Sequence, residues 1–242
     1  MADNLELQTL DDRAIIRQLG TLRNRIAERF PTRGLTKTAT HLADISRPTA
    51  RDAASLGKTH WGLRMLSVIA IAGAVAGLIQ LGVFFRVQVS SELQLTEFTQ
   101  ALEAALNIVL LSGVFIIFFV RLENRFKREK ALKGLYRLRA IAHVIDMHQL
   151  TKDPPSIVGS APTSSSPVRD LTEEELLRYL DYCSEMLSFT GKLAALYAQY
   201  FPDATVTAAV NDIEQLTTNL SRKIWQKIVL IQGGQQEFRS SQ

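Results

Sequence analysis

The stretch MLSVIAIAGAVAGLIQLGVFF at residues 65–85 is an apolar run without an ionisable side chain, and its most polar member is Gln80. A second apolar run, AALNIVLLSGVFIIFFV at residues 104–120, also lacks ionisable side chains. A helix rises about 1.5 Å per residue, so about 20 residues cross the ~30 Å hydrocarbon core of a bilayer. The two runs therefore predict an all-α membrane protein with a two-span transmembrane hairpin. The alternative is a pair of buried core helices in a soluble protein.

Basic residues gather on the outer flank of each run. They are Arg47, Arg51, Lys58 and Arg64 before the first run, and Arg121, Arg125, Lys127, Arg128, Lys130 and Lys133 after the second. The loop between the runs holds Arg86 against Glu92, Glu97 and Glu103. Basic flanks stay in the cytoplasm, so the pattern predicts a multi-pass protein of the inner (plasma) membrane with both termini cytoplasmic. No apolar segment precedes residue 65, so no secretory signal peptide is expected.

The net charge of +4 and the isoelectric point of about 9.3 come largely from these flanks. Each Lys or Arg near an anionic surface contributes about 1 kcal/mol of attraction to lipid headgroups. We therefore expect a bilayer with anionic headgroups as a partner. No nucleic-acid recognition motif is present, and no small-molecule substrate is evident.

Three polar residues lie within the predicted spans. Gln80 and Asn107 are each about five residues from the midpoint of their run, on the same side of the membrane, and Ser112 marks the second midpoint. Polar side chains in a bilayer commonly face another helix, where a hydrogen bond contributes ~0.6–2 kcal/mol. The favoured interpretation is that Gln80 and Asn107 join the spans, within one chain or between subunits. The alternative is a polar pore lining.

The first span also contains the sequence GAVAG, which places Gly73 and Gly77 four residues apart. Small residues at this spacing let two helix backbones approach closely. Both glycines are therefore predicted to be helix-packing positions.

The remaining segments are predicted to be cytoplasmic and mostly helical. Leu135, Leu138, Ile141, Ala142 and Ile145 form an apolar stripe in the segment after the second span, which has the composition of a stalk helix. The Pro/Ser-rich sequence that follows is typical of a flexible linker. The predicted segments are residues 1–60 (N-terminal helix and basic juxtamembrane segment), 61–86 (first span), 87–102 (extracytoplasmic loop), 103–121 (second span), 122–152 (stalk helix), 153–169 (linker), 170–233 (αα-hairpin) and 234–242 (disordered tail).

The C-terminal αα-hairpin has the clearest local signals. Thr172 and Glu175 make a capping box, and Leu171 and Leu176 have the spacing of a hydrophobic staple. Apolar residues then follow in alternating steps of three and four, with Thr190 or Gly191 filling the gap between Leu187 and Ala194. The break at residues 200–203 separates two helices with matched seams. The seams are Leu176, Leu180, Cys183, Leu187, Ala194, Tyr197 and Phe201, and Val206, Val210, Ile213, Thr217, Leu220, Ile224 and Ile228; the second helix is expected to stop at Gly233-Gly234.

The N-terminal segment predicts one further amphipathic helix, from Asp11 to Phe30, with Ile15, Leu19, Leu22 and Ile26 on its seam. Residues 32–57 are polar and Thr-rich, and no structure is predicted for them. A coiled-coil-like helical bundle, within or between chains, would bury the amphipathic stripes.

The only cluster with catalytic residue types is RAIAHVIDMHQLTKD at residues 139–153. His143 and Asp146 share a helical face and are weak acid–base candidates. His148 points about 140° away from His143 on an ideal helix, so the three residues do not converge on a metal. Cys183 is the one cysteine and falls on an apolar seam. We therefore expect no catalytic residue, no metal and no cofactor.

Together these patterns lead to a hypothesis of function. The chain would be a non-catalytic anchor, scaffold or regulatory subunit that acts through cytoplasmic helical interactions with a second copy or a helical partner. One alternative is a homo-oligomeric channel or transport component with polar residues of the spans lining a pore. Another is an enzyme that works at the membrane face through His143 and Asp146. The spans lack ionisable residues, the usual mark of an ion or proton path, so the channel is the weaker hypothesis.

Overall fold

A computed structural model describes residues 9–58, 61–88, 95–150, 152, 164 and 170–240. Every regular element in these ranges is a helix, as the sequence predicts. The chain divides into two compact units, one formed by Met1–Gly57 with Lys130–Gln242 and the other by Lys58–Glu129. Most of the predicted linker at residues 153–169 lies outside the described residues.

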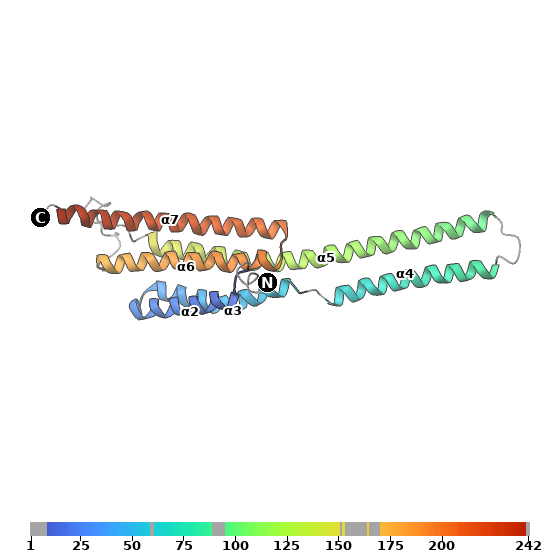
Figure 1. Cartoon of the computed structure of the whole chain (residues 1–242), viewed down its shortest axis with the longest axis horizontal. Helices are drawn as coiled ribbons and strands as arrows, with labels where there is room; N and C mark the ends of the chain where they lie inside the picture. The colour runs from blue at the N-terminus through green and yellow to red at the C-terminus, as the bar shows by residue number, and fades with distance from the viewer. Residues whose placement is uncertain are drawn as a thin grey trace, which may run out of the picture. The chain divides into compact units, whose positions relative to one another are not determined.

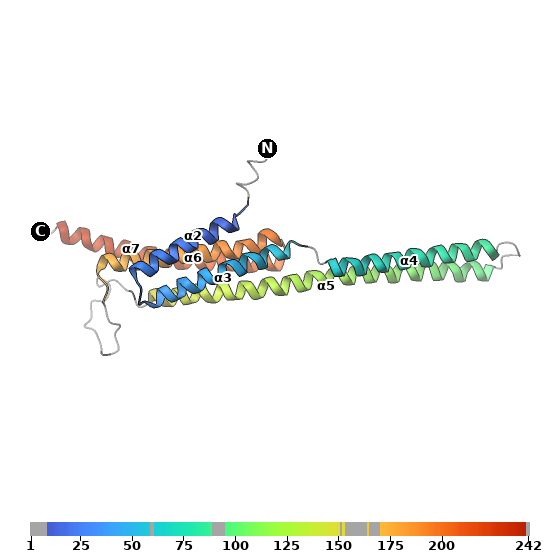
Figure 2. The same cartoon turned by 90° about the horizontal axis from the view of Figure 1, so that it is seen from below.

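The first unit is a helical bundle (Figures 1 and 2). Its helices are α2 (Asp12–Arg29), α3 (Gly34–Leu56), α6 (Glu173–Tyr200), α7 (Ala204–Ser240) and the last part of α5 (Leu95–Leu150). Helices α6 and α7 lie side by side along their lengths, and α2 and α3 form a second pair that packs on α6. The predicted αα-hairpin at the C-terminal end agrees with the first of these pairs.

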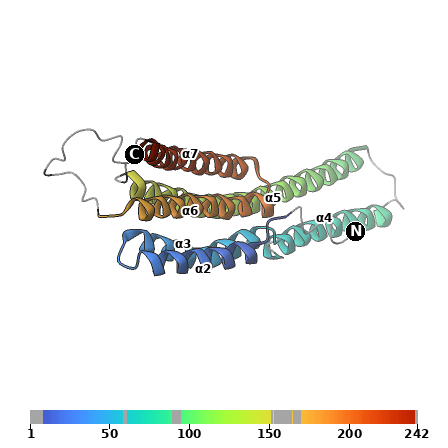
Figure 3. The same ribbon diagram turned by 60° about the vertical axis from the view of Figure 1, so that its left-hand side comes forward.

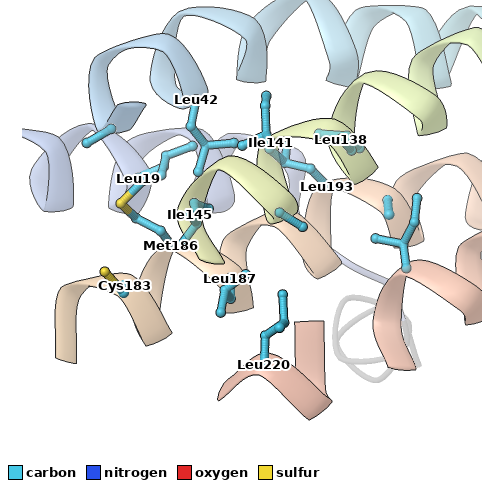
Figure 4. Close-up of a cluster of buried hydrophobic side chains, with 14 of the residues drawn as sticks. Leu19, Leu42, Leu138, Ile141, Ile145, Cys183, Met186, Leu187, Leu193 and Leu220 are labelled. Atoms are coloured by element: carbon cyan, nitrogen blue, oxygen red, sulfur yellow. The ribbon is translucent and has the colours of Figure 1, made fainter. Parts of the chain in front are cut away.

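The core of this unit is built from the apolar seams of all five helices. Figure 4 shows Leu19, Leu42, Leu138, Met186 and Leu220 among the side chains that meet there. The seams predicted for α2, α5 and α7 are buried throughout, and the α6 seam is buried up to Tyr197. Burying a Leu or Ile side chain contributes about 1.5–3 kcal/mol, so these seams are the main source of the bundle's stability.

Helix α3 covers the segment for which the sequence predicts no structure. Its buried face is made mostly of small or weakly apolar residues, namely Leu35, Thr38, Ala39, Leu42, Ser46, Thr49, Ala50, Ala53 and Leu56. The face is periodic but holds few large apolar residues, and its small side chains let α3 pack against both α2 and α6. Pro48 lies inside the helix, where a proline normally lowers helix stability by about 3 kcal/mol. Its presence is a further reason why the sequence does not predict this helix.

The helix ends follow local capping rules. The predicted capping box is confirmed, because Glu175 N donates to Thr172 Oγ1 at 3.2 Å and Thr172 N donates to Glu175 Oε2 at 2.8 Å. Asp203 caps α7 by accepting from Thr205 N at 3.1 Å. Helix α7 continues to Ser240, so the predicted stop at Gly233-Gly234 and the predicted disordered tail are wrong up to that residue. Glycine costs a helix only about 1 kcal/mol, and no proline follows to end it.

The second unit is a pair of antiparallel helices, α4 (Trp61–Gln88) and the first part of α5 (Figure 3). Both helices extend into the predicted extracytoplasmic loop, and the centre of that loop lies outside the described residues. Within the described part of the chain, one helix is long and apolar enough to cross a membrane, namely the part of α5 from Leu102 to Leu150. A shorter apolar helix, Ile71–Gln80, lies in α4.

Candidate functional site

The surface of the second unit carries large apolar side chains that point into solvent. Leu110 is 68% exposed, Leu106 61% and Ile69 61%, and many of their apolar neighbours on α4 and α5 are about half exposed. None of the most apolar stretch of α5 is buried. A continuous apolar surface of this kind marks contact with a membrane or another protein.

The polar residues predicted to join the two spans do not do so within this chain. The side chains of Gln80 and Asn107 are both exposed, and neither makes a hydrogen bond to any described residue. The sequence predicts matching membrane depths for the two amides, but it does not determine which face of each helix they occupy. Ser112 Oγ donates to the carbonyl oxygen of Ile108 at 2.6 Å, so this hydroxyl is satisfied by its own helix. A contact of Gln80 and Asn107 between subunits stays a prediction.

Gly73 and Gly77, the two glycines predicted to be packing positions, have different surroundings in α4. A Cβ built on Gly77 would lie 3.5 Å from Ile108 Cδ1, which is ordinary van der Waals contact between α4 and α5. No such neighbour lies within 4 Å of Gly73, which instead lines a cleft of about 440 Å³ with Ile108, Ser112 and Phe115. Gly77 is therefore a packing position in the hairpin, whereas Gly73 faces an apolar hollow.

The acid–base candidates are not assembled into a site. His143 is exposed and makes no hydrogen bond or ion pair among the residues that the structure describes. Asp146 Oδ1 instead accepts a hydrogen bond from Gln149 Nε2 at 2.5 Å. No group of three metal-ligating side chains occurs within the described ranges.

His148 has a structural contact that the sequence does not predict. Its Nε2 lies 2.8 Å from Thr38 Oγ1, which joins the end of α5 to α3. Burial, followed by the charge of Lys152, lowers the pKa of His148 below its ordinary value. The neutral imidazole is therefore favoured, and His148 serves to hold α3 against α5.

A feature that sequence reasoning missed is a basic groove of about 840 Å³ between α2 and α3. Its rim carries Arg13, Arg17, Arg47 and Arg51, and Arg23 and Asp12 also line it. The signal that could have revealed it is the spacing of the arginines. Arg13 and Arg17 lie four residues apart on α2, and so do Arg47 and Arg51 on α3, so each pair occupies one face of its helix.

The chain matches no protein-family model, no curated protein and no solved structure.

Proposed function

We propose that the chain is a two-span protein of the inner membrane, with both termini cytoplasmic, that acts as a non-catalytic anchor, scaffold or regulatory subunit. The observation that carries the proposal is the contrast between the two units. Large apolar side chains are exposed throughout the second unit, whereas those on the seams of the first unit are buried. A bilayer would cover the exposed side chains, each of which is worth about 1.5–3 kcal/mol when removed from water.

Two further observations favour a bilayer over a soluble environment. Both apolar runs lack ionisable residues, and basic residues flank them on the side of the two termini. The exposure of the runs also counts against the alternative of core helices in a soluble protein, because no part of the described chain covers them.

The helical bundle supplies a surface for interactions of the kind proposed. Tyr136, Met147 and Leu150 are 62%, 64% and 56% exposed on α5, at spacings that place them on one face of the helix. Through this face the bundle would bind a second copy of the chain or a helical partner protein.

The membrane assignment is tested by alkaline carbonate extraction of membranes that contain the full chain. Wild-type protein should stay with the membrane. The double variant Val75→Arg/Val114→Arg should be released, because each arginine at a span centre costs about 2.5–3.5 kcal/mol on the insertion scale. Thr218→Arg, on the exposed face of α7, is the matched control and should behave as wild type. Release of the wild type, or retention of the double variant, would contradict the assignment.

The orientation is tested with introduced cysteines and a membrane-impermeant maleimide. Ser90→Cys should react in intact cells or spheroplasts, whereas Thr218→Cys should react only after the membrane is opened. The natural Cys183 is buried, so it contributes little background. Labelling of Thr218→Cys from outside would contradict cytoplasmic termini.

A channel is the second candidate, because the exposed amides of Gln80 and Asn107 are available to line a path between subunits. The deciding measurement is the mass of the protein in mild detergent by light scattering, corrected for bound detergent and lipid. A monomer or dimer offers too few spans to enclose an aqueous path and would exclude this candidate. In a larger ring, Gln80→Leu should change the conductance of the reconstituted protein.

A further inference from the structure

The groove between α2 and α3 is hollow because of the residues at its floor. Ala50 is small and only 2% exposed, and Gly20 has no side chain at all. A Cβ built on Gly20 would have no neighbour within 4 Å, so a side chain at this position would project into open space. Glycine in the interior of a helix costs about 1 kcal/mol relative to alanine, and no packing contact in the structure compensates for it.

The arginines on the rim lack anionic partners. Arg13, Arg17, Arg47 and Arg51 are exposed, and their guanidinium groups form no ion pair or hydrogen bond with any residue that the structure describes. Several positive charges around one hollow repel one another, and an anion in the groove would remove that repulsion.

Several other cations of the same bundle are paired with carboxylates. Arg25 pairs with Glu185 at 3.1 Å, Arg33 with Asp170 at 2.7 Å, and Lys130 with Asp52 at 3.1 Å. In each of these pairs a carboxylate on another segment meets the cation. The groove therefore collects an excess of positive charge, because its lining holds five arginines and one carboxylate, that of Asp12.

We propose that this groove binds a ligand with two or more phosphate groups. The guanidinium of arginine presents a planar fork of donors that matches phosphate oxygens in pairs. The four arginines come from two helices and surround a volume within the range of about 300–1,000 Å³ that is typical of small-molecule sites. A ligand with several phosphates can meet both pairs of arginines at once.

Two sources could supply this chemistry. One is a soluble polyphosphate compound, and the other is an anionic phospholipid whose headgroup carries two separate phosphates. The proposal does not depend on the membrane assignment, because the groove lies wholly within α2 and α3. Ligand binding to the groove and extraction from membranes are measured separately, so the ligand proposal and the membrane assignment can each be refuted without the other.

The test is isothermal titration calorimetry of the full chain, purified in a zwitterionic detergent, with two soluble probes. One probe is inorganic tripolyphosphate, and the other is the deacylated cardiolipin headgroup, which carries two phosphates. Citrate serves as a polyanion without phosphate. At least one phosphate probe should bind, more tightly than citrate, and its binding should weaken as ionic strength rises. The tighter of the two phosphate probes identifies the source.

Three variants connect binding to the groove. The double variant Arg17→Gln/Arg47→Gln removes one arginine from each helix and should weaken binding by about tenfold or more for each arginine. Its matched control is Arg29→Gln/Arg222→Gln, which removes two exposed arginines outside the groove and should leave the affinity unchanged. Gly20→Leu keeps every charge but fills the hollow, and it should abolish binding. All the substituted arginines are exposed and Gly20 has open space, so circular dichroism should show a folded bundle in each case.

Several results would overturn the proposal. One such result is that neither phosphate probe binds, and another is that citrate binds as tightly as both of them. The groove variant and its matched control lose the same affinity, which would indicate general attraction to a basic protein. Gly20→Leu binds as wild type, which would place the ligand outside the groove.

Discussion

Gly134 in α5 faces the ring of Tyr197 in α6, and this contact allows a sharp test of the bundle. A Cβ built on Gly134 would lie 2.5 Å from Tyr197 Cζ and closer still to the hydroxyl oxygen. The Tyr197 side chain is fully buried, so the ring cannot move aside into solvent. Its hydroxyl has no hydrogen-bond partner among the described residues, and burial raises the pKa of Tyr197 to about 12.

The substitution Gly134→Ala sets two effects against each other. Alanine is the better helix former, which favours the folded state by about 1 kcal/mol. Overpacking a core costs typically 1–3 kcal/mol, and here both the hydroxyl and the ring carbon must shift, which places the cost at the upper end of that range. We therefore expect a net loss of about 1–2 kcal/mol, which for a unit of this size lowers Tm by about 2–8 °C.

The assay is thermal unfolding of the full chain in detergent, followed by far-ultraviolet circular dichroism. The matched control is Gly20→Ala, also at a helical glycine, where a Cβ meets nothing within 4 Å. This control should raise the stability by about 0.5–1 kcal/mol. The double variant Gly134→Ala/Tyr197→Leu should be less destabilised than the sum of its single variants, because leucine vacates the space that the new methyl needs. An unchanged or raised Tm for Gly134→Ala would refute the packing of α5 against α6 described above.

Three further predictions follow from other contacts. The folded state lowers the pKa of His148, so unfolded chains bind a proton first as the pH falls below about 6.5, and the stability of the fold should decline there. A pH series of melting curves should show a smaller decline for His148→Gln than for the wild type. Cys183 is fully buried and its pKa is raised to about 12 by burial, so a maleimide should label it only when denaturant unfolds the bundle; fast labelling of the native protein would contradict this. Thr172→Ala removes the acceptor for Glu175 N and should cost about 1 kcal/mol in denaturant titrations, whereas the exposed Thr218→Ala should cost nothing measurable.

Sequence reasoning was most successful where a strong apolar seam recurs at helical spacing. The seams of α2, α5 and α7 are buried as predicted, and so is the α6 seam up to Tyr197. It failed for α3, whose buried face is rich in Ala, Thr and Ser and contains Pro48. Such residues have little hydrophobicity of their own, and they are buried only because α2 and α6 pack against them.

The candidate sites were harder to predict, because each depends on which face a helix turns toward its neighbour and on which helix that neighbour is. The sequence predicts matching depths for Gln80 and Asn107 by counting along the two apolar runs, but their exposed positions depend on how α4 and α5 pack. The same holds for the basic groove. The pairs Arg13–Arg17 and Arg47–Arg51 are each visible in the sequence, yet nothing in it states that the two pairs surround one hollow.

The sequence by itself determined the two apolar runs, the seams of α2, α5, α6 and α7 and the cap at Thr172, because these depend on residues close together in the chain. The tertiary structure alone decided which helix faces meet. It placed Tyr197 over Gly134, His148 against Thr38, and two arginine pairs around one groove. The physical reason is that periodicity specifies which face of a helix is apolar, whereas the partner of that face is chosen by the fit of side chains that lie far apart in the chain.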